Sequence, residues 1–104
     1  MMMTNNELAV IDAQIEASGY NVTYQMIDLV TAYIVVRCMR AYSYSGAPNV
    51  ISDLTETIAE YFNISRGLAW AIQDAIFSNP PEMLRSVTMS MEWRGKVIYE
   101  NPYY

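Results

Sequence analysis

Histidine is absent from the 104-residue chain, and cysteine occurs once, at Cys38. Without histidine the chain cannot form Ser-His-Asp or Cys-His nucleophile systems, histidine metal sites or the usual switch near neutral pH. A single cysteine cannot form an internal disulfide, so the sequence does not imply an oxidising compartment. We therefore expect a protein that is not an enzyme and uses no metal and no cofactor, with Cys38 as a buried structural thiol.

Charged side chains are also scarce, at 16% of the residues, with 6 basic against 11 acidic and a net charge of −5. Ordinary globular domains contain about 25% charged residues, so we expect apolar surface that is left over for a partner. The few cations argue against a general nucleic-acid binder, because such proteins gain affinity by neutralising phosphates. No two acidic residues are adjacent, which excludes a polyacidic tail.

Long hydrophobic runs are missing as well. The longest uncharged apolar stretch in the middle of the chain, Leu29 to Val36, is far shorter than the ~20 residues that a membrane span needs. The N-terminus has neither the positive region nor the apolar run of a signal peptide. We expect a cytoplasmic protein that enters no membrane, and the length predicts one domain over residues 1–104.

Apolar spacing and capping residues predict four main helices. A capping box over Thr4–Glu7 begins the first. The second is apolar nearly all round, which predicts a central helix buried on every side; an apolar face left exposed would be a dimer or partner surface. Asn79-Pro80-Pro81 ends the fourth, and 81–86 add a short turn of helix. The expected helices span about 5–18, 23–42, 52–62 and 65–78.

After residue 86 the pattern changes, because apolar and polar residues alternate up to Glu92. This period of two predicts a β-hairpin over about 87–100. We expect a three-residue turn at Trp93-Arg94-Gly95, with Glu92 opposite Lys96 and Trp93 exposed at the tip. The predicted fold class is therefore α+β, mostly helical, with a C-terminal β-hairpin.

Residues Thr55–Asp74 resemble the helix-turn-helix of bacterial and phage DNA-binding regulators. Ala59 is the small residue at the helix crossing, Asn63 occupies the turn in a left-handed conformation, and Ser65 caps the second helix. With the hairpin as a wing, the unit is similar to a winged helix-turn-helix. The resemblance implies a dimeric DNA-binding transcriptional regulator. The implied DNA contacts are Ser65, Arg66 and Trp70 in the major groove and Arg94 and Lys96 on phosphates.

Acidic side chains occupy the same motif and favour a different function. Asp53, Glu56 and Glu60 follow the spacing i, i+3, i+7 and form one acidic stripe where phosphates should lie. Asp74, on the expected recognition helix, would also repel a DNA backbone. Charges of this sign suit a protein partner better than DNA.

We therefore expect a non-enzymatic, acidic protein-interaction module that forms a homodimer, with the DNA-binding regulator as the alternative. An example of the type is a phage- or plasmid-encoded inhibitor or modulator of a host nucleic-acid-handling complex. Trp93 is an interface candidate because a turn tip gives an indole little to pack against, while Trp70 is either a partner anchor or core. The expected partner surface comprises Asp53, Glu56, Glu60, Trp70, Trp93 and Arg94.

Overall fold

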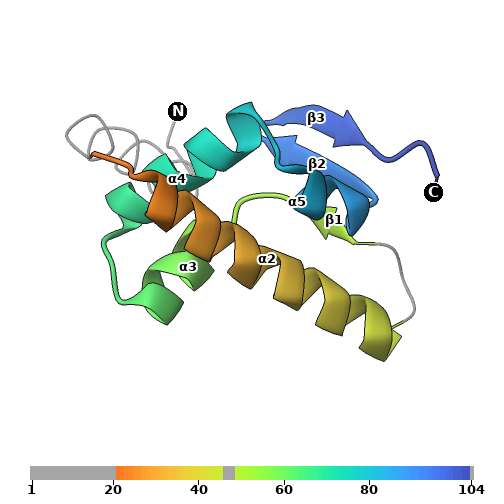
Figure 1. The fold of residues 1–104 in the computed structure, drawn as a ribbon, viewed down its shortest axis with the longest axis horizontal. Coiled ribbons are helices and arrows are strands. Elements are labelled where there is room, and N and C mark those ends of the chain that lie inside the picture. The colour runs from red at the N-terminus through yellow and green to blue at the C-terminus, as the bar shows by residue number, and fades with distance from the viewer. Residues whose placement is uncertain (1–20, 46–48, 104) are drawn as a thin grey trace, which may run out of the picture.

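The computed structural model describes residues 21–45 and 49–103 (Figure 1). The helix expected at 5–18 lies outside the described residues. The described elements are α2 (Tyr24–Ser45), β1 (Val50–Ile51), α3 (Thr55–Phe62), α4 (Arg66–Ser78), α5 (Glu82–Ser86), β2 (Ser90–Trp93) and β3 (Lys96–Glu100). The α+β, mostly helical fold class is confirmed, and the short helix expected near residues 81–86 is α5.

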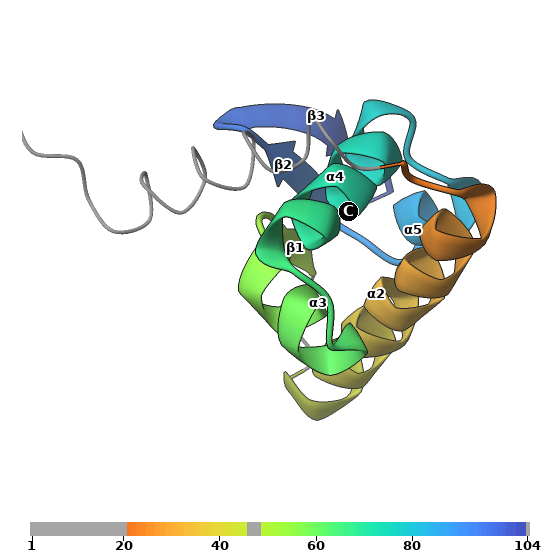
Figure 2. The same ribbon diagram turned by 90° about the vertical axis from the view of Figure 1, so that its left-hand side faces the viewer.

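The long helix α2 begins after Thr23, whose Oγ1 accepts a hydrogen bond from the Met26 backbone N–H at 3.2 Å. It continues three residues beyond the expected end at residue 42, because no glycine or proline occurs before Gly46. One face, with Ile34 and Cys38, is buried. The expectation that this helix is buried on every side is wrong, since α2 lies at the edge of the molecule with α3 and α4 on one side of it (Figure 2).

Helices α3 and α4 are joined by a tight turn at Asn63. Asn63 has φ 54°, in the left-handed conformation that the sequence predicted, and the Ile64 N–H donates to the Ala59 carbonyl oxygen at 3.0 Å. Ser65 then caps α4, since its Oγ accepts a hydrogen bond from the Leu68 N–H at 3.1 Å. The helix-turn-helix arrangement of this pair follows from these two local signals.

A buried glutamine fixes how α3 and α4 meet. Gln73 is fully buried, its Nε2 donates to the Thr55 hydroxyl at 2.7 Å, and its Oε1 accepts from the Leu54 N–H at 2.8 Å. A buried amide is tolerated only when its polar atoms have partners, so these bonds set one relative position of the two helices.

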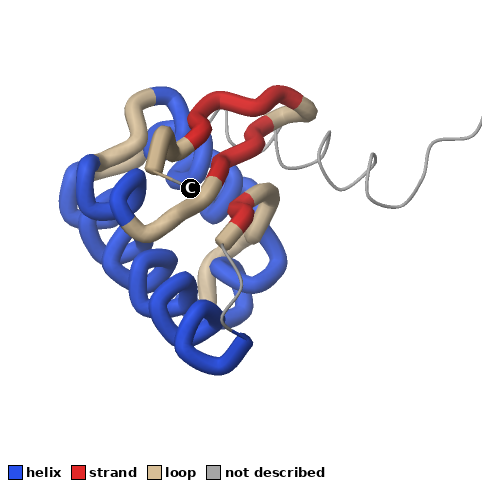
Figure 3. Tube along the Cα trace, turned by 90° about the vertical axis from the view of Figure 1, so that its right-hand side faces the viewer, coloured by secondary structure: helices blue, strands red, loops and turns tan. Residues whose placement is uncertain are grey.

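The strands form one three-stranded sheet in the order β1-β2-β3, gathered at one side of the helices (Figure 3). β1 pairs in parallel with β2, Val50 opposite Ser90, and was not predicted because two residues show no alternation. Asn49 anchors this junction: its Nδ2 donates to the carbonyl oxygens of Cys38 at 2.8 Å and Val87 at 3.2 Å. The sheet is thereby attached to α2.

The hairpin is confirmed, but its turn and register are not those expected. Arg94 and Gly95 form a two-residue turn with φ 55° and 77°, and Trp93 pairs with Lys96. Positive φ at both central residues is typical of the type I′ turn, whose twist suits a two-residue hairpin. Glu92 consequently lies opposite Val97 rather than Lys96, and Trp93 is in the strand rather than at the tip.

Candidate interaction surface

The acidic stripe is shorter than expected because α3 begins at Thr55, not at residue 52. Asp53 precedes the helix, and its Oδ1 accepts hydrogen bonds from the Thr55 N–H at 2.8 Å and the Thr55 hydroxyl at 2.5 Å. An aspartate bonded two residues onward makes a local turn that competes with helix. Of the three acidic residues, only Glu56 and Glu60 therefore lie on α3 itself, where both are exposed.

Tyr61 joins these two glutamates on the exposed side of α3, with 65% of its surface accessible. Its ring stacks on Tyr33 of α2, with centroids 4.1 Å apart and an interplanar angle of 18°. The Tyr33 hydroxyl accepts a hydrogen bond from Arg37 Nη1 at 3.2 Å. We call Glu56, Glu60 and Tyr61 the α3 surface. Tyr61 was not among the expected partner residues, although it lies outside the apolar set Ile58, Ala59 and Phe62.

The expected recognition helix, α4, has a single cation, Arg66, at its first position. Arg66 Nη1 lies 3.3 Å from Glu56 Oε1 in an ion pair across the helix-turn-helix. Its neighbour Ser65 uses its hydroxyl oxygen as the helix cap. Two of the groups expected in the DNA major groove are thus engaged within the protein.

The expectation that Trp93 is exposed at the hairpin tip is wrong. Only 7% of its surface is accessible, because the two-residue turn leaves it in β2, facing α4. Its ring stacks on Phe77, with centroids 4.8 Å apart, and its Nε1 donates to Asp74 Oδ1 at 2.9 Å. Asp74 therefore binds the hairpin rather than projecting freely toward a groove.

Trp70 is also a core residue, 7% exposed, with its ring centroid 5.4 Å from that of Trp93. Arg94 is exposed, and its guanidinium carbon lies 5.6 Å from the centroid of the Trp70 ring. The structure brings Trp70, Trp93 and Arg94 together. The two indoles, however, pack on each other inside the protein and offer little surface to a partner. Lys96 is exposed at the start of β3.

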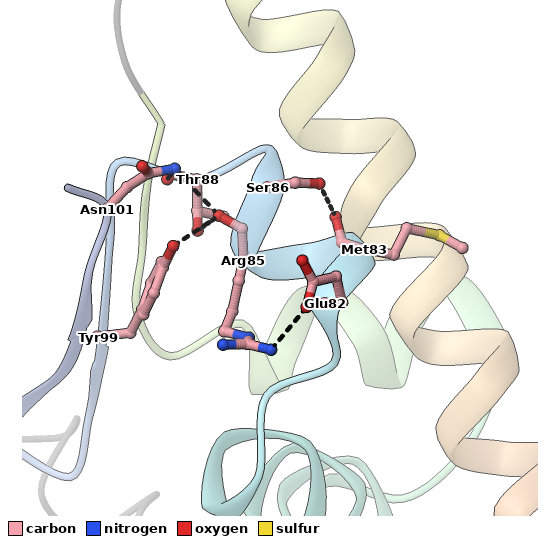
Figure 4. A network of polar contacts seen from close by, with 7 residues as sticks. All are labelled: Glu82, Met83, Arg85, Ser86, Thr88, Tyr99 and Asn101. Carbon is pink, nitrogen blue, oxygen red and sulfur yellow. Dashed lines mark hydrogen bonds and ion pairs between the residues drawn. The ribbon is translucent and has the colours of Figure 1, made fainter. Parts of the chain in front are cut away.

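Arg85 belongs to a network between α5 and the C-terminal end of β3 (Figure 4). Its Nη2 lies 3.0 Å from Glu82 Oε2, and its carbonyl oxygen accepts hydrogen bonds from Tyr99 Oη and Asn101 Nδ2, each at 3.2 Å. These residues line a shallow pocket of about 280 Å³. The polar groups drawn there hold α5 to the sheet.

Cys38 is buried as expected for a structural thiol. Burial raises its pKa from 9.0 to about 11, an effect that the nearby Arg37 charge partly opposes. A thiol with this pKa is protonated at neutral pH and is a poor nucleophile. Within residues 21–45 and 49–103, no three His, Cys, Asp or Glu side chains are grouped so that they could hold a metal ion.

Among the helices of the described segments, none is long and apolar enough to cross a membrane. Comparisons of the chain with known protein families, with curated proteins and with solved structures found no match.

Proposed function

We propose that the protein is a non-enzymatic protein-interaction module, in which the helix-turn-helix-like scaffold presents the α3 surface to a basic partner protein. Two exposed carboxylates beside an exposed tyrosine complement a surface rich in arginine and lysine, and the aromatic ring adds contact area. The stacked Tyr33 ring supports Tyr61 in the free protein, so less side-chain freedom is lost on binding.

The observation that carries this proposal is the ion pair between Arg66 and Glu56. It engages the one cation of α4 with a carboxylate of α3, and the exposed Glu60 leaves the surface where a regulator would neutralise phosphates with an acidic excess. DNA-binding proteins instead offer several free cations there. A partner that handles nucleic acid is a fitting target, because such proteins have basic surfaces that carboxylates can cover. An inhibitor or modulator encoded by a phage or plasmid would act in this way.

Affinity capture from a host lysate, with and without nuclease, tests the proposal. We compare the wild type with E56Q/E60Q and with E92Q/E100Q, which removes two exposed charges from the hairpin and so matches the change in net charge. The expected result is capture of a protein that persists after nuclease treatment, is lost with E56Q/E60Q and is retained with E92Q/E100Q. Capture that nuclease abolishes, or that both variants lose equally, would contradict the proposal.

A dimeric winged helix-turn-helix regulator is the second candidate, favoured by the order α3, turn, α4, hairpin and by the exposed Lys96 on the hairpin. Its low cation content requires two half-sites for useful affinity. A salt titration with a pool of random genomic fragments separates the candidates. Retardation that weakens steeply with salt would support the regulator, and no retardation at low salt would remove it.

A further inference from the structure

Helix α2 has an apolar outer face that the described part of the fold leaves exposed. Leu29, Ala32, Val36 and Met39 follow one another at spacings of three, four and three residues, and all are exposed. The accessible fractions of the three larger side chains are 55% for Leu29, 43% for Val36 and 56% for Met39. The opposite face of the helix contains the buried Ile34 and Cys38, so the core does not need this row. We call these four residues the α2 seam.

The spacing of the seam is that of a coiled coil. Alternation of three and four residues keeps side chains on one stripe of a helix that packs against a second helix. Gln25 and Ser43, both exposed, continue the alternation at either end with spacings of four. A stripe of this width suits another helix better than a strand or an irregular peptide.

The seam is also complementary to itself. Its positions are symmetric about residue 34, so a second α2 lying antiparallel places Leu29 opposite Met39 of the second copy. The same symmetry places Ala32 opposite Val36 of the second copy. The two large side chains, Leu29 and Met39, then meet at the ends of the interface. The small Ala32 meets the β-branched Val36 near its centre. A two-fold axis requires such a self-complementary patch.

Charges at the two ends of the seam favour the antiparallel direction. Asp28 adjoins its N-terminal end and Arg40 its C-terminal end, and both are exposed. In an antiparallel pair each carboxylate lies at the level of the opposite copy's guanidinium, and the helix dipoles oppose one another. In a parallel pair like charges would lie at the same level and the dipoles would be aligned.

We propose that the α2 seam is a self-association surface, which binds the α2 seam of a second copy of this chain in an antiparallel, two-fold arrangement. The proposal does not depend on the function proposed for α3, which uses other residues. Because only four apolar residues per copy form the contact, the interface lies at the small end of specific interfaces. The dimer should therefore dissociate at concentrations on the order of micromolar.

Sedimentation velocity of the full chain across a wide concentration range tests the association. Val36→Glu places a charge in the seam, and Val97→Glu places the same charge at an exposed valine of β3, 54% accessible against 43% for Val36. We expect the wild type and Val97→Glu to dimerise alike and Val36→Glu to need at least ten times more protein. A wild type that stays monomeric, as when another segment or a different protein covers the face, would overturn the proposal, and so would equal effects of both variants.

Disulfide trapping tests the direction with milder changes. Separately prepared Leu29→Cys and Met39→Cys proteins are oxidised alone and as a mixture. The antiparallel arrangement predicts cross-linked dimer mainly in the mixture, since residue 29 then lies opposite residue 39 of the other copy. Dimer that forms equally well from Leu29→Cys alone indicates a parallel pair and overturns the proposed geometry, and no cross-link in any sample overturns the seam itself.

Discussion

Trp93 of the hairpin donates its indole N–H to the Asp74 carboxylate of α4 at 2.9 Å, and this bond joins the sheet to the helix-turn-helix. Phe77 stacks on the same indole, so the hairpin is held to α4 by one polar and one aromatic contact. The hairpin is thereby packed against α4 through the buried Trp93.

Replacing Asp74 by alanine should destabilise the fold by about 1–3 kcal/mol, because the indole N–H is left buried without an acceptor. Asp74→Asn keeps an acceptor oxygen and should cost less. Urea unfolding followed by tryptophan fluorescence measures both. Glu92→Ala, on the exposed side of the same strand, is the control and should change the free energy of unfolding by no more than about 0.5 kcal/mol. Equal effects of Asp74→Ala and Glu92→Ala would mean that the bond contributes nothing.

The two-residue turn makes a second prediction, at Gly95. An added Cβ meets no atom within 4 Å, so only the backbone conformation at φ +77° opposes a side chain. Gly95→Ala should therefore cost about 1–2 kcal/mol. Gly95→Asn, which adopts left-handed backbone more readily, should cost less, and thermal unfolding compares the two. Alanine that is tolerated as well as asparagine would contradict the positive φ at Gly95.

Cys38 gives a prediction about reactivity and pH. The buried thiol should react with a disulfide reagent at pH 8 only as fast as the protein opens, whereas the exposed thiol of a Val97→Cys variant should react at once. Because the folded pKa of about 11 lies above the unfolded value of 9.0, the folded state retains its proton longer. The contribution of this group to stability is therefore complete below pH 9 and decreases as the pH rises from 9 towards 11. Rapid modification of native Cys38 would contradict this placement.

The buried amide of Gln73 gives a fourth prediction. Gln73→Leu preserves much of the volume but removes the acceptor of the Leu54 N–H and the donor to Thr55. Loss of these buried partners should reduce the free energy of unfolding by about 1–3 kcal/mol. Asn21→Leu, at an exposed position just before α2, is the control and should leave the unfolding midpoint in urea nearly unchanged. A Gln73→Leu variant of unchanged stability would show that apolar packing alone positions α3 on α4.

Local signals predicted much of the described fold, and tertiary contacts decided the rest. Ser65 and Asn63 give the helix-turn-helix its ends, because a cap and a left-handed turn depend on neighbours in the chain. The exposure of Trp93 could not be predicted from local sequence. It depends on whether the turn has two or three residues, and on packing against Phe77, sixteen positions earlier in the chain. β1 was missed because its partner β2 lies 40 residues away in sequence.

The candidate site was predictable to a similar degree. Glu56 and Glu60 are on the exposed side of α3, as their spacing indicated. Asp53 instead precedes the helix, where its carboxylate accepts hydrogen bonds from Thr55. The stack of Tyr61 on Tyr33 joins two helices, so no pattern within one helix reveals it.

Site-specific photo-crosslinking at Tyr61 asks whether the α3 surface contacts a basic protein. A photoreactive phenylalanine derivative replaces Tyr61 of the α3 surface, and the exposed Tyr103 receives the same residue as control. The proteins are irradiated in nuclease-treated lysate of the native host. The account predicts a discrete adduct to a basic protein at position 61 that is weak or absent at position 103 and is lost when Glu56 and Glu60 are neutralised. Equal adducts at both positions, or an adduct at position 61 that forms only when nucleic acid is left intact, would contradict it.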